Sequence, residues 1–288
     1  MSIHPSPPNA AMHGSSQLPA STSRCQRIIE GLAFVTIWVI LGYLLPVSEN
    51  GYLLLGIPLT IGFQKLVRRR PLRELWAGNT TRFALDKPGV GMAAVLAAVP
   101  AYYATRALAA SDWTLLGWYV AAIAGAAFAA FALRASSPLA MLRSAALPMA
   151  VGAGGMVVVL GAVHIATGAP LSALATVAAI AKYVALYFPA TFVLEEVAFR
   201  GALDAHVHHE GETRGWQSAL FVSALWGLWH LPFATGLPLP ILVLWLVVVH
   251  ALIGVPLSFA WRRTRNLAGT GLAHAVIDAV RNALLLGL

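Results

Sequence analysis

Long apolar runs separated by short polar connections dominate the chain. Nine such runs cover residues 28–46, 51–65, 90–110, 113–133, 145–167, 172–194, 216–234, 240–261 and 266–286. A helix that crosses a hydrocarbon core of about 30 Å needs about 20 mostly apolar residues. Because lipid offers no partners for backbone N–H and C=O groups, such segments are expected to be helices. The pattern therefore predicts an all-α, polytopic transmembrane bundle of about eight or nine spans, and the short run 51–65 decides between the two counts.

The composition agrees with a chain that is solvated by lipid. Apolar residues make up 59% of the 288 residues and charged residues only 10%, unlike ordinary water-soluble domains. The Ser- and Pro-rich residues 1–27 are expected to form a disordered polar tail. N-terminal transmembrane helices are expected in 28–167 and a C-terminal transmembrane core in 168–288. The run 28–46 is too long for a signal-peptide core and is interpreted as an uncleaved first span.

The positive charges fall in every second connection between the apolar runs. The loops at 47–50, 111–112, 168–170 and 235–239 contain no Lys or Arg, whereas the alternate loops carry Lys65, Arg68, Arg69, Arg70, Arg73, Arg82, Lys87, Arg134, Arg143, Arg200, Arg214, Arg262, Arg263 and Arg265. By the positive-inside rule the basic loops and the N-terminal tail are expected in the cytoplasm. In a bacterium, the bilayer concerned would be the inner membrane. Topology thereby accounts for the net charge of +8, and no nucleic-acid partner is expected.

Three acidic residues are placed differently from the other carboxylates. Glu195, Glu196 and Asp278 lie within apolar runs or at their edges, where an ionisable group is costly and a functional role is the default hypothesis. Helical spacing puts Glu196 and Arg200 on one face at i, i+4, where Arg200 can hold the carboxylate ionised. Glu195 then points about 100° away and is free for another task. The competing interpretation is a cap and salt bridge at the cytoplasmic end of a span.

Two further segments place histidines inside apolar runs. Trp226 and His230 are one turn apart, and so are His274 and Asp278. Each pair has a structural alternative, because a buried histidine can be satisfied by a backbone carbonyl and Asp278 can pair with Arg281 at i, i+3. Taken together, ionisable groups on three spans have no inexpensive place except facing one another inside the bundle. A shared polar cavity would supply a general base, a bound water and donors for an oxyanion.

The three segments, in this order, resemble a known family of membrane proteases. The motifs are Glu-Glu-x-x-x-Arg at 195–200, aromatic-x-x-x-His at 226–230 and His-x-x-x-Asp at 274–278. They resemble the CPBP family of intramembrane glutamic endopeptidases, which includes the CAAX prenyl-protein proteases and abortive-infection-like proteins. The resemblance covers about 183–281. Trp226 stands where the family usually has Phe, and Asp278 stands where many members have Asn.

The resemblance implies roles for individual side chains. Glu195 would activate a water molecule and His230 would assist it, while His274 with Asp278 would stabilise the oxyanion. Glu196, Arg200 and Trp226 would support these four residues. An ionised Asp278 would repel an oxyanion that it faced directly, so it is expected to act on His274 instead.

By resemblance, the activity would be hydrolysis of a peptide bond in a membrane-associated or lipidated protein, with the site near the cytoplasmic side where Glu195 falls. A metal-free glutamate mechanism is favoured; a Zn²⁺ ion is the alternative, held by Glu195, His230 and His274. The histidines at 206, 208 and 209 are interpreted as part of a solvated loop. The rival functions are a catalytically inactive scaffold or immunity protein of the same fold and a proton-coupled transporter, which the absence of an internal repeat disfavours.

Overall fold

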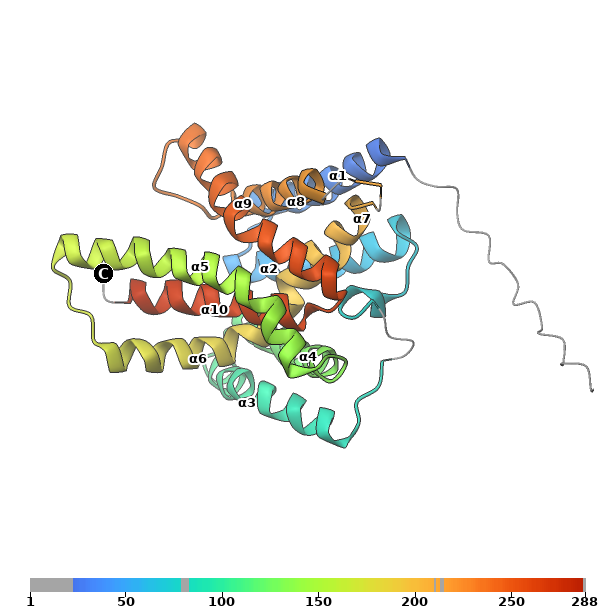
Figure 1. Ribbon diagram of the computed structural model, residues 1–288. Coiled ribbons are helices and arrows are strands. Elements are labelled where there is room, and N and C mark those ends of the chain that lie inside the picture. The colour runs from blue at the N-terminus through green and yellow to red at the C-terminus, as the bar shows by residue number, and fades with distance from the viewer. Residues whose placement is uncertain (1–22, 79–82, 210, 213–214, 287–288) are drawn as a thin grey trace, which may run out of the picture.

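The computed structural model describes residues 23–78, 83–209, 211–212 and 215–286, and in these residues the chain is helical with no strand (Figure 1). The elements are α1 (Arg24–Leu44), α2 (Glu49–Gly62), η1 (Phe63–Val67), η2 (Leu72–Leu75), α3 (Lys87–Ala109), α4 (Trp113–Arg134), α5 (Pro138–Thr167), α6 (Ala173–Thr191), η3 (Phe192–Asp204), α7 (Ala205–Val207), α8 (Trp216–Trp229), α9 (Leu239–Thr264) and α10 (Leu267–Leu285). The prediction of an all-α polytopic bundle is confirmed.

Within the described residues, six helical segments are long and apolar enough to cross a membrane. They are α1, α3, α4, α5, α9 and the continuous segment Ala173–Val207, which joins α6, η3 and α7. The three other expected spans are also helices, but α2 and α8 have 14 residues each. At 1.5 Å per residue they extend only about 21 Å, less than a hydrocarbon core of about 30 Å. The third, α10, has 19 residues and carries His274, Asp278 and Arg281, which lower its hydropathy.

Several element boundaries differ from the expected ones for identifiable reasons. Helix α1 begins at Arg24, inside the segment assigned to the tail, because the hydroxyl of Ser23 caps it by accepting from the N–H of Gln26; the rest of that tail, 1–22, lies outside the described residues. Helix α8 ends at Trp229 rather than at 234, since Pro232 disfavours helix in the residue before it. The expected end of a span at 194 is wrong, because the helix continues through η3 and α7 to Val207.

The connections gather at two ends of the bundle. At one end, which we call the basic end, η1, η2 and α7 lie together (Figure 1). Gly78 there donates to the carbonyl of Arg265 at 2.9 Å, and Arg68 donates to the carbonyl of Gly201 at 3.0 Å. The α5–α6 and α8–α9 connections lie at the other end, which we call the neutral end. There the hydroxyl of Tyr52 donates to the carbonyl of Trp229 at 2.8 Å.

Small residues let the helices approach closely around α10, which packs on α5 and α6, and between α4 and α6. At Gly125 on α4, an added Cβ atom would lie 2.1 Å from the carbonyl oxygen of Pro189 on α6. This contact is with backbone, which cannot move aside as a flexible side chain can. The close α4–α6 crossing matters for the site because α6 leads directly into η3, the segment that carries the paired glutamates.

We expect Gly125→Ala to destabilise the protein by about 1–3 kcal/mol through overpacking. The matched control is Gly155→Ala on an exposed face of α5, where an added Cβ meets nothing within 4 Å and alanine gains up to about 1 kcal/mol of helix propensity. Thermal unfolding of both purified variants in detergent measures the difference. Equal melting temperatures for the two variants would contradict the close crossing.

Candidate active site

The paired glutamates lie on η3, where the helix widens from α to π hydrogen bonding. Such widened turns are rare and occur frequently at functional sites. Glu196 is fully buried, whereas 13% of the Glu195 side chain is exposed. The two neighbouring carboxylates therefore have different surroundings, and only Glu195 reaches the space in which a substrate could bind.

One imidazole connects three carboxylates. The Nδ1 atom of His274 lies 2.9 Å from Oε1 of Glu196, and its Nε2 atom lies 3.4 Å from Oδ2 of Asp278 and 3.8 Å from Oε2 of Glu195. Because a carboxylate only accepts, the Glu196 contact is made by an Nδ1–H donor when Glu196 is ionised. This bond orients the ring so that Nε2 faces Glu195 and Asp278.

Asp278 makes both of the contacts that its sequence spacing allowed. Its Oδ2 atom faces His274, and its Oδ1 atom lies 3.3 Å from Nη2 of Arg281. Arg281 is the more exposed partner, with 44% of its side chain accessible. Asp278 thus bridges a buried imidazole and an exposed guanidinium. Its expected contact with His274 and its alternative contact with Arg281 therefore do not exclude each other.

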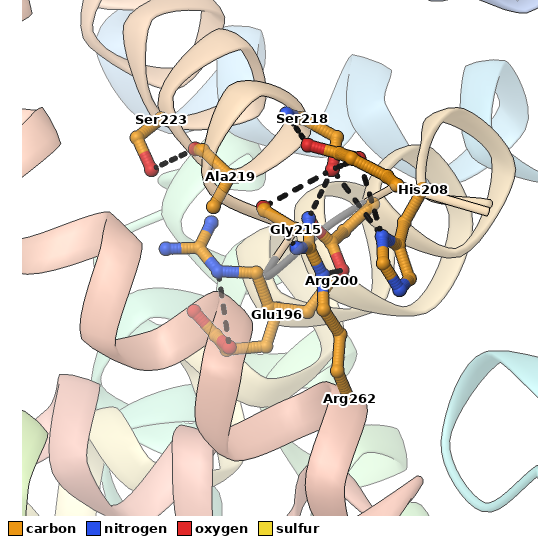
Figure 2. Close-up of polar contacts among 10 residues, drawn as sticks. Glu196, Arg200, His208, Gly215, Ser218, Ala219, Ser223 and Arg262 are labelled. Atoms are coloured by element: carbon orange, nitrogen blue, oxygen red, sulfur yellow. Dashed lines mark hydrogen bonds and ion pairs between the residues drawn. The ribbon is translucent and has the colours of Figure 1, made fainter. Parts of the chain in front are cut away.

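Arg200 is fully buried beneath this cluster. Its Nε atom lies 4.0 Å from Oε2 of Glu196, so the i, i+4 pair exists but is loose (Figure 2). None of its three nitrogens has a hydrogen-bond partner within the described residues. Its guanidinium carbon instead lies 4.5 Å from the ring centre of Trp226, a cation–π contact that a desolvated site strengthens. The Coulombic attraction of Glu196 and the face of Trp226 together compensate this charge.

The indole of Trp226 has a polar function that phenylalanine could not perform. Its Nε1–H donates to Oε2 of Glu195 at 3.0 Å, and its ring meets the ring of His274 edge to face at 5.0 Å. Within the described contacts, Trp226 and His274 both approach Oε2 of Glu195. The other oxygen, Oε1, is therefore the one left to accept a proton from a water molecule.

His230 lies at the C-terminal end of α8, and its Nδ1–H donates to the carbonyl of Trp226 at 2.9 Å. The interpretation that a backbone carbonyl satisfies this histidine is thus correct for one ring nitrogen, Nδ1. Because the carbonyl can only accept, the neutral ring carries its proton on Nδ1 and keeps a lone pair on Nε2. That lone pair is available to a water molecule in the cavity beside it.

Sequence reasoning missed His250 on α9. Its ring centre lies 4.3 Å from that of His230 and 4.7 Å from that of Trp226. Its Nδ1–H donates to the carbonyl of Leu246 at 2.7 Å, so it has the same tautomer as His230. The available signal was an imidazole inside a 26-residue apolar helix, which the rule for ionisable groups at membrane depth identifies even without a motif.

A cavity of about 160 Å³ connects these side chains. Its lining includes Glu195, Trp226, His230, His250, His274 and Asp278, and its volume is sufficient for several water molecules. All four residues expected to be catalytic thus lie around one space, together with Trp226. Glu196 and Arg200 do not line it and lie behind its wall.

One cluster of possible metal ligands overlaps the set that was expected for a Zn²⁺ ion. In the described part of the chain, Glu195, His274 and Asp278 each offer a ligand atom, all within 4.8 Å of one another. His230, which was expected in the set, does not belong to this group. The two carboxylates and one imidazole match the donor types of a catalytic zinc site.

The fold and this geometry define a polytopic membrane protein with a buried carboxylate–histidine site. Residues 176–280 match the family model described as type II CAAX prenyl endopeptidase Rce1-like. No curated protein and no solved structure matches the chain. The matched segment contains every motif residue from Glu195 to Asp278, and this match supports the resemblance to the CPBP/CAAX protease family.

We expect Arg200→Met to destabilise the protein by about 3–5 kcal/mol, because it leaves the buried Glu196 without its cation. The double variant Arg200→Met/Glu196→Gln should recover a large part of this loss, since it removes both charges. Arg263→Met, at an exposed position, is the matched control. Unfolding in mixed detergent and SDS micelles measures all three. Equal stability of Arg200→Met and Arg263→Met would show that the buried pair has no such role.

Proposed function

We propose that the protein is an intramembrane endopeptidase that hydrolyses a peptide bond with a water molecule activated by Glu195. The observation that supports this proposal best is the contact of one imidazole, His274, with Glu195, Glu196 and Asp278 beside a cavity that can hold several water molecules. The family match supports a CAAX-type protease at the level of the class. A general base, an oriented proton donor and space for water are the components that peptide hydrolysis requires.

In the proposed reaction, Glu195 takes a proton from water as the water oxygen attacks the scissile carbonyl carbon. The π electrons of the C=O bond move onto its oxygen and form a tetrahedral oxyanion, which the Nε2–H of a protonated His274 stabilises. When the C=O bond re-forms, the C–N bond breaks and the amine leaves with the proton from Glu195. His230 assists by accepting a hydrogen bond from the water through Nε2.

The supporting residues hold these groups in place. Glu196 fixes the ring of His274 through Nδ1, and Trp226 fixes Oε2 of Glu195. Asp278, whose Oδ2 atom lies 3.4 Å from Nε2 of His274, balances the charge of a protonated His274. This arrangement favours a metal-free mechanism, because a protonated imidazole cannot bind a metal. If Zn²⁺ is used instead, Glu195, His274 and Asp278 would hold it and it would supply Lewis-acid activation of the water; adding a zinc chelator to the cleavage assay separates the two mechanisms.

The proposed substrate is a membrane-associated or lipidated protein, since the site lies within the bundle and the matched family is named for prenyl endopeptidases. The basic end is proposed to face the cytoplasm, together with the N-terminus. Among the contacts of the described residues, none specifically favours the inactive-scaffold or the transporter alternative. Both predict that no peptide is cleaved, and the transporter additionally predicts a proton flux in liposomes.

We expect Glu195→Gln to reduce kcat/KM for a fluorogenic membrane peptide by at least about 10²-fold, because general-base catalysis contributes about 10²–10⁴-fold. The variant should remain folded, since glutamine can still accept from Nε1–H of Trp226. Glu74→Gln on η2, outside the cavity, is the matched control. Cleavage by Glu195→Gln at the rate of Glu74→Gln would disprove the assignment.

We expect Asp278→Asn to retain activity but to move the alkaline limb of the kcat/KM profile to lower pH. The reason is that removing this carboxylate removes Coulombic support for the protonated form of His274. Asp278→Ala, which leaves Nε2 without this neighbour, should lose more activity than Asp278→Asn. The measurement is a pH–rate profile for the wild type and both variants.

Arg281→Gln distinguishes the two contacts of Asp278 in the same assay. If Asp278 served only to pair with Arg281, Arg281→Gln would reproduce the effect of Asp278→Asn. An unchanged alkaline limb in Asp278→Asn would contradict the role proposed for its charge.

A further inference from the structure

The site is closed toward the basic end. Directly behind its wall, Glu196 and Arg200 are fully buried, and a second polar layer follows. In that layer Arg262 donates to both oxygens of Asp204, at 2.9 and 2.6 Å, and to the carbonyl of Gly215 at 2.6 Å and the hydroxyl of Ser218 at 2.9 Å (Figure 2). Asp204 is fully buried as well.

The loop side chains around Ser218 strengthen this closure. Glu212, only 9% exposed, accepts from the backbone N–H of Ser218 at 2.8 Å and from its hydroxyl. Burial, the largest influence, raises the pKa of Glu212, but the hydrogen bonds from Ser218 and His208 and the charge of Arg262 together lower it below its ordinary value. The expectation of a solvated loop is therefore wrong for His206, which is 8% exposed and pairs with Glu30, and the neighbouring Glu212 is not solvated either. Their partners come from other elements, which the loop sequence alone does not reveal.

The same cavity reaches the surface in the opposite direction. Its floor is made by His274 and Trp226, which are 2% and 3% exposed. Its lining continues to Glu49, Phe233 and Arg281, of which Glu49 and Arg281 are exposed. Glu49 begins α2, and Phe233 follows α8, so both adjoin connections of the neutral end. Exposure thus increases from the floor to the neutral end, and the mouth of the cavity lies there.

The charge distribution assigns the two ends to opposite sides of the membrane. The basic end contains the Lys- and Arg-rich connections, and the connections of the neutral end contain none of these residues. Under the positive-inside rule the basic end is cytoplasmic. The mouth then opens away from the cytoplasm. The span that carries Glu195 does not end at 194 as expected but continues to Val207, so Glu195 lies inside the helix rather than at its end.

We propose that the substrate enters from the non-cytoplasmic side and is a peptide segment exposed there, next to the membrane. This proposal rests on the proposed endopeptidase activity. It disfavours a prenylated C-terminal tail in the cytoplasm as the substrate, because the buried Glu196–Arg200 and Asp204–Arg262 layers separate the cytoplasmic end from Glu195. A segment tethered to the outer leaflet can reach the mouth without crossing these layers.

Cysteine accessibility tests the direction of the mouth without any measurement of activity. In a Cys25→Ser background, Thr235→Cys reports on the neutral end, Phe233→Cys on the mouth and Gln217→Cys, exposed at the start of α8, on the basic end. None of these three substitutions removes a positive charge, so the signal that sets topology is kept. The probe is a membrane-impermeant, sulfonated thiol reagent added to intact cells.

We expect Thr235→Cys and Phe233→Cys to be labelled in intact cells. Gln217→Cys should stay unlabelled until the membrane is opened. The reverse pattern would overturn the proposal, and so would labelling of Phe233→Cys only from the side that labels Gln217→Cys. Either result would leave the proposed activity intact, because the Glu195→Gln comparison can be made with detergent-solubilised protein, in which both ends are accessible. If the wild-type protein in detergent cleaved the peptide no faster than Glu195→Gln does, the proposed activity would be disproved.

Cleavage by oriented proteoliposomes then tests the substrate. An impermeant peptide added on the side that labels Phe233→Cys should be cleaved, and the same peptide on the other side should not. If cleavage occurs in detergent but only from the Gln217 side in sealed vesicles, the proposed substrate class is wrong although the enzyme is active.

Discussion

The cost of placing charge inside an apolar bundle governs this structure. A lone ion at membrane depth is expensive, and the candidate site brings three carboxylates together, on Glu195, Glu196 and Asp278. Arg200 and Arg281 supply two positive charges, and a protonated His274 would supply the third. The imidazole contacts all three carboxylates, so the arrangement of η3 against α10 and the balance of charge depend on the same ring.

This constraint also explains why aromatic side chains surround the site. Trp226 provides a π face for Arg200, an edge contact for His274 and an N–H donor for Glu195. One indole therefore serves three neighbours in a region with few polar partners. Its position on α8 further places the histidines at 230 and 250 at the same cavity, because His230 bonds to the carbonyl of Trp226 and His250 packs on its ring.

The two ends of the bundle differ in how they satisfy polar groups. The basic end is held by half-buried arginine side chains that donate to backbone carbonyls of other elements, such as Arg68 to Gly201 and Arg262 to Gly215. At the neutral end the cavity lining reaches exposed side chains. A site built in this way admits water from one direction, while the opposite direction carries the ion pairs that position its carboxylates.

The sequence by itself determined the helical class and the interactions between residues of one helix. Apolar run lengths predict helices because lipid cannot satisfy the backbone, and the His274–Asp278 and Glu196–Arg200 pairs follow from helical spacing. Only the tertiary structure decided the contacts between helices, such as His274 to Glu196 and Trp226 to Glu195. It also added His250, shortened α8, extended the helix beyond Glu195 and put the cavity mouth at the neutral end. Periodicity determines which face of a helix a side chain occupies, but the neighbour of that face and its depth depend on packing between segments distant in sequence.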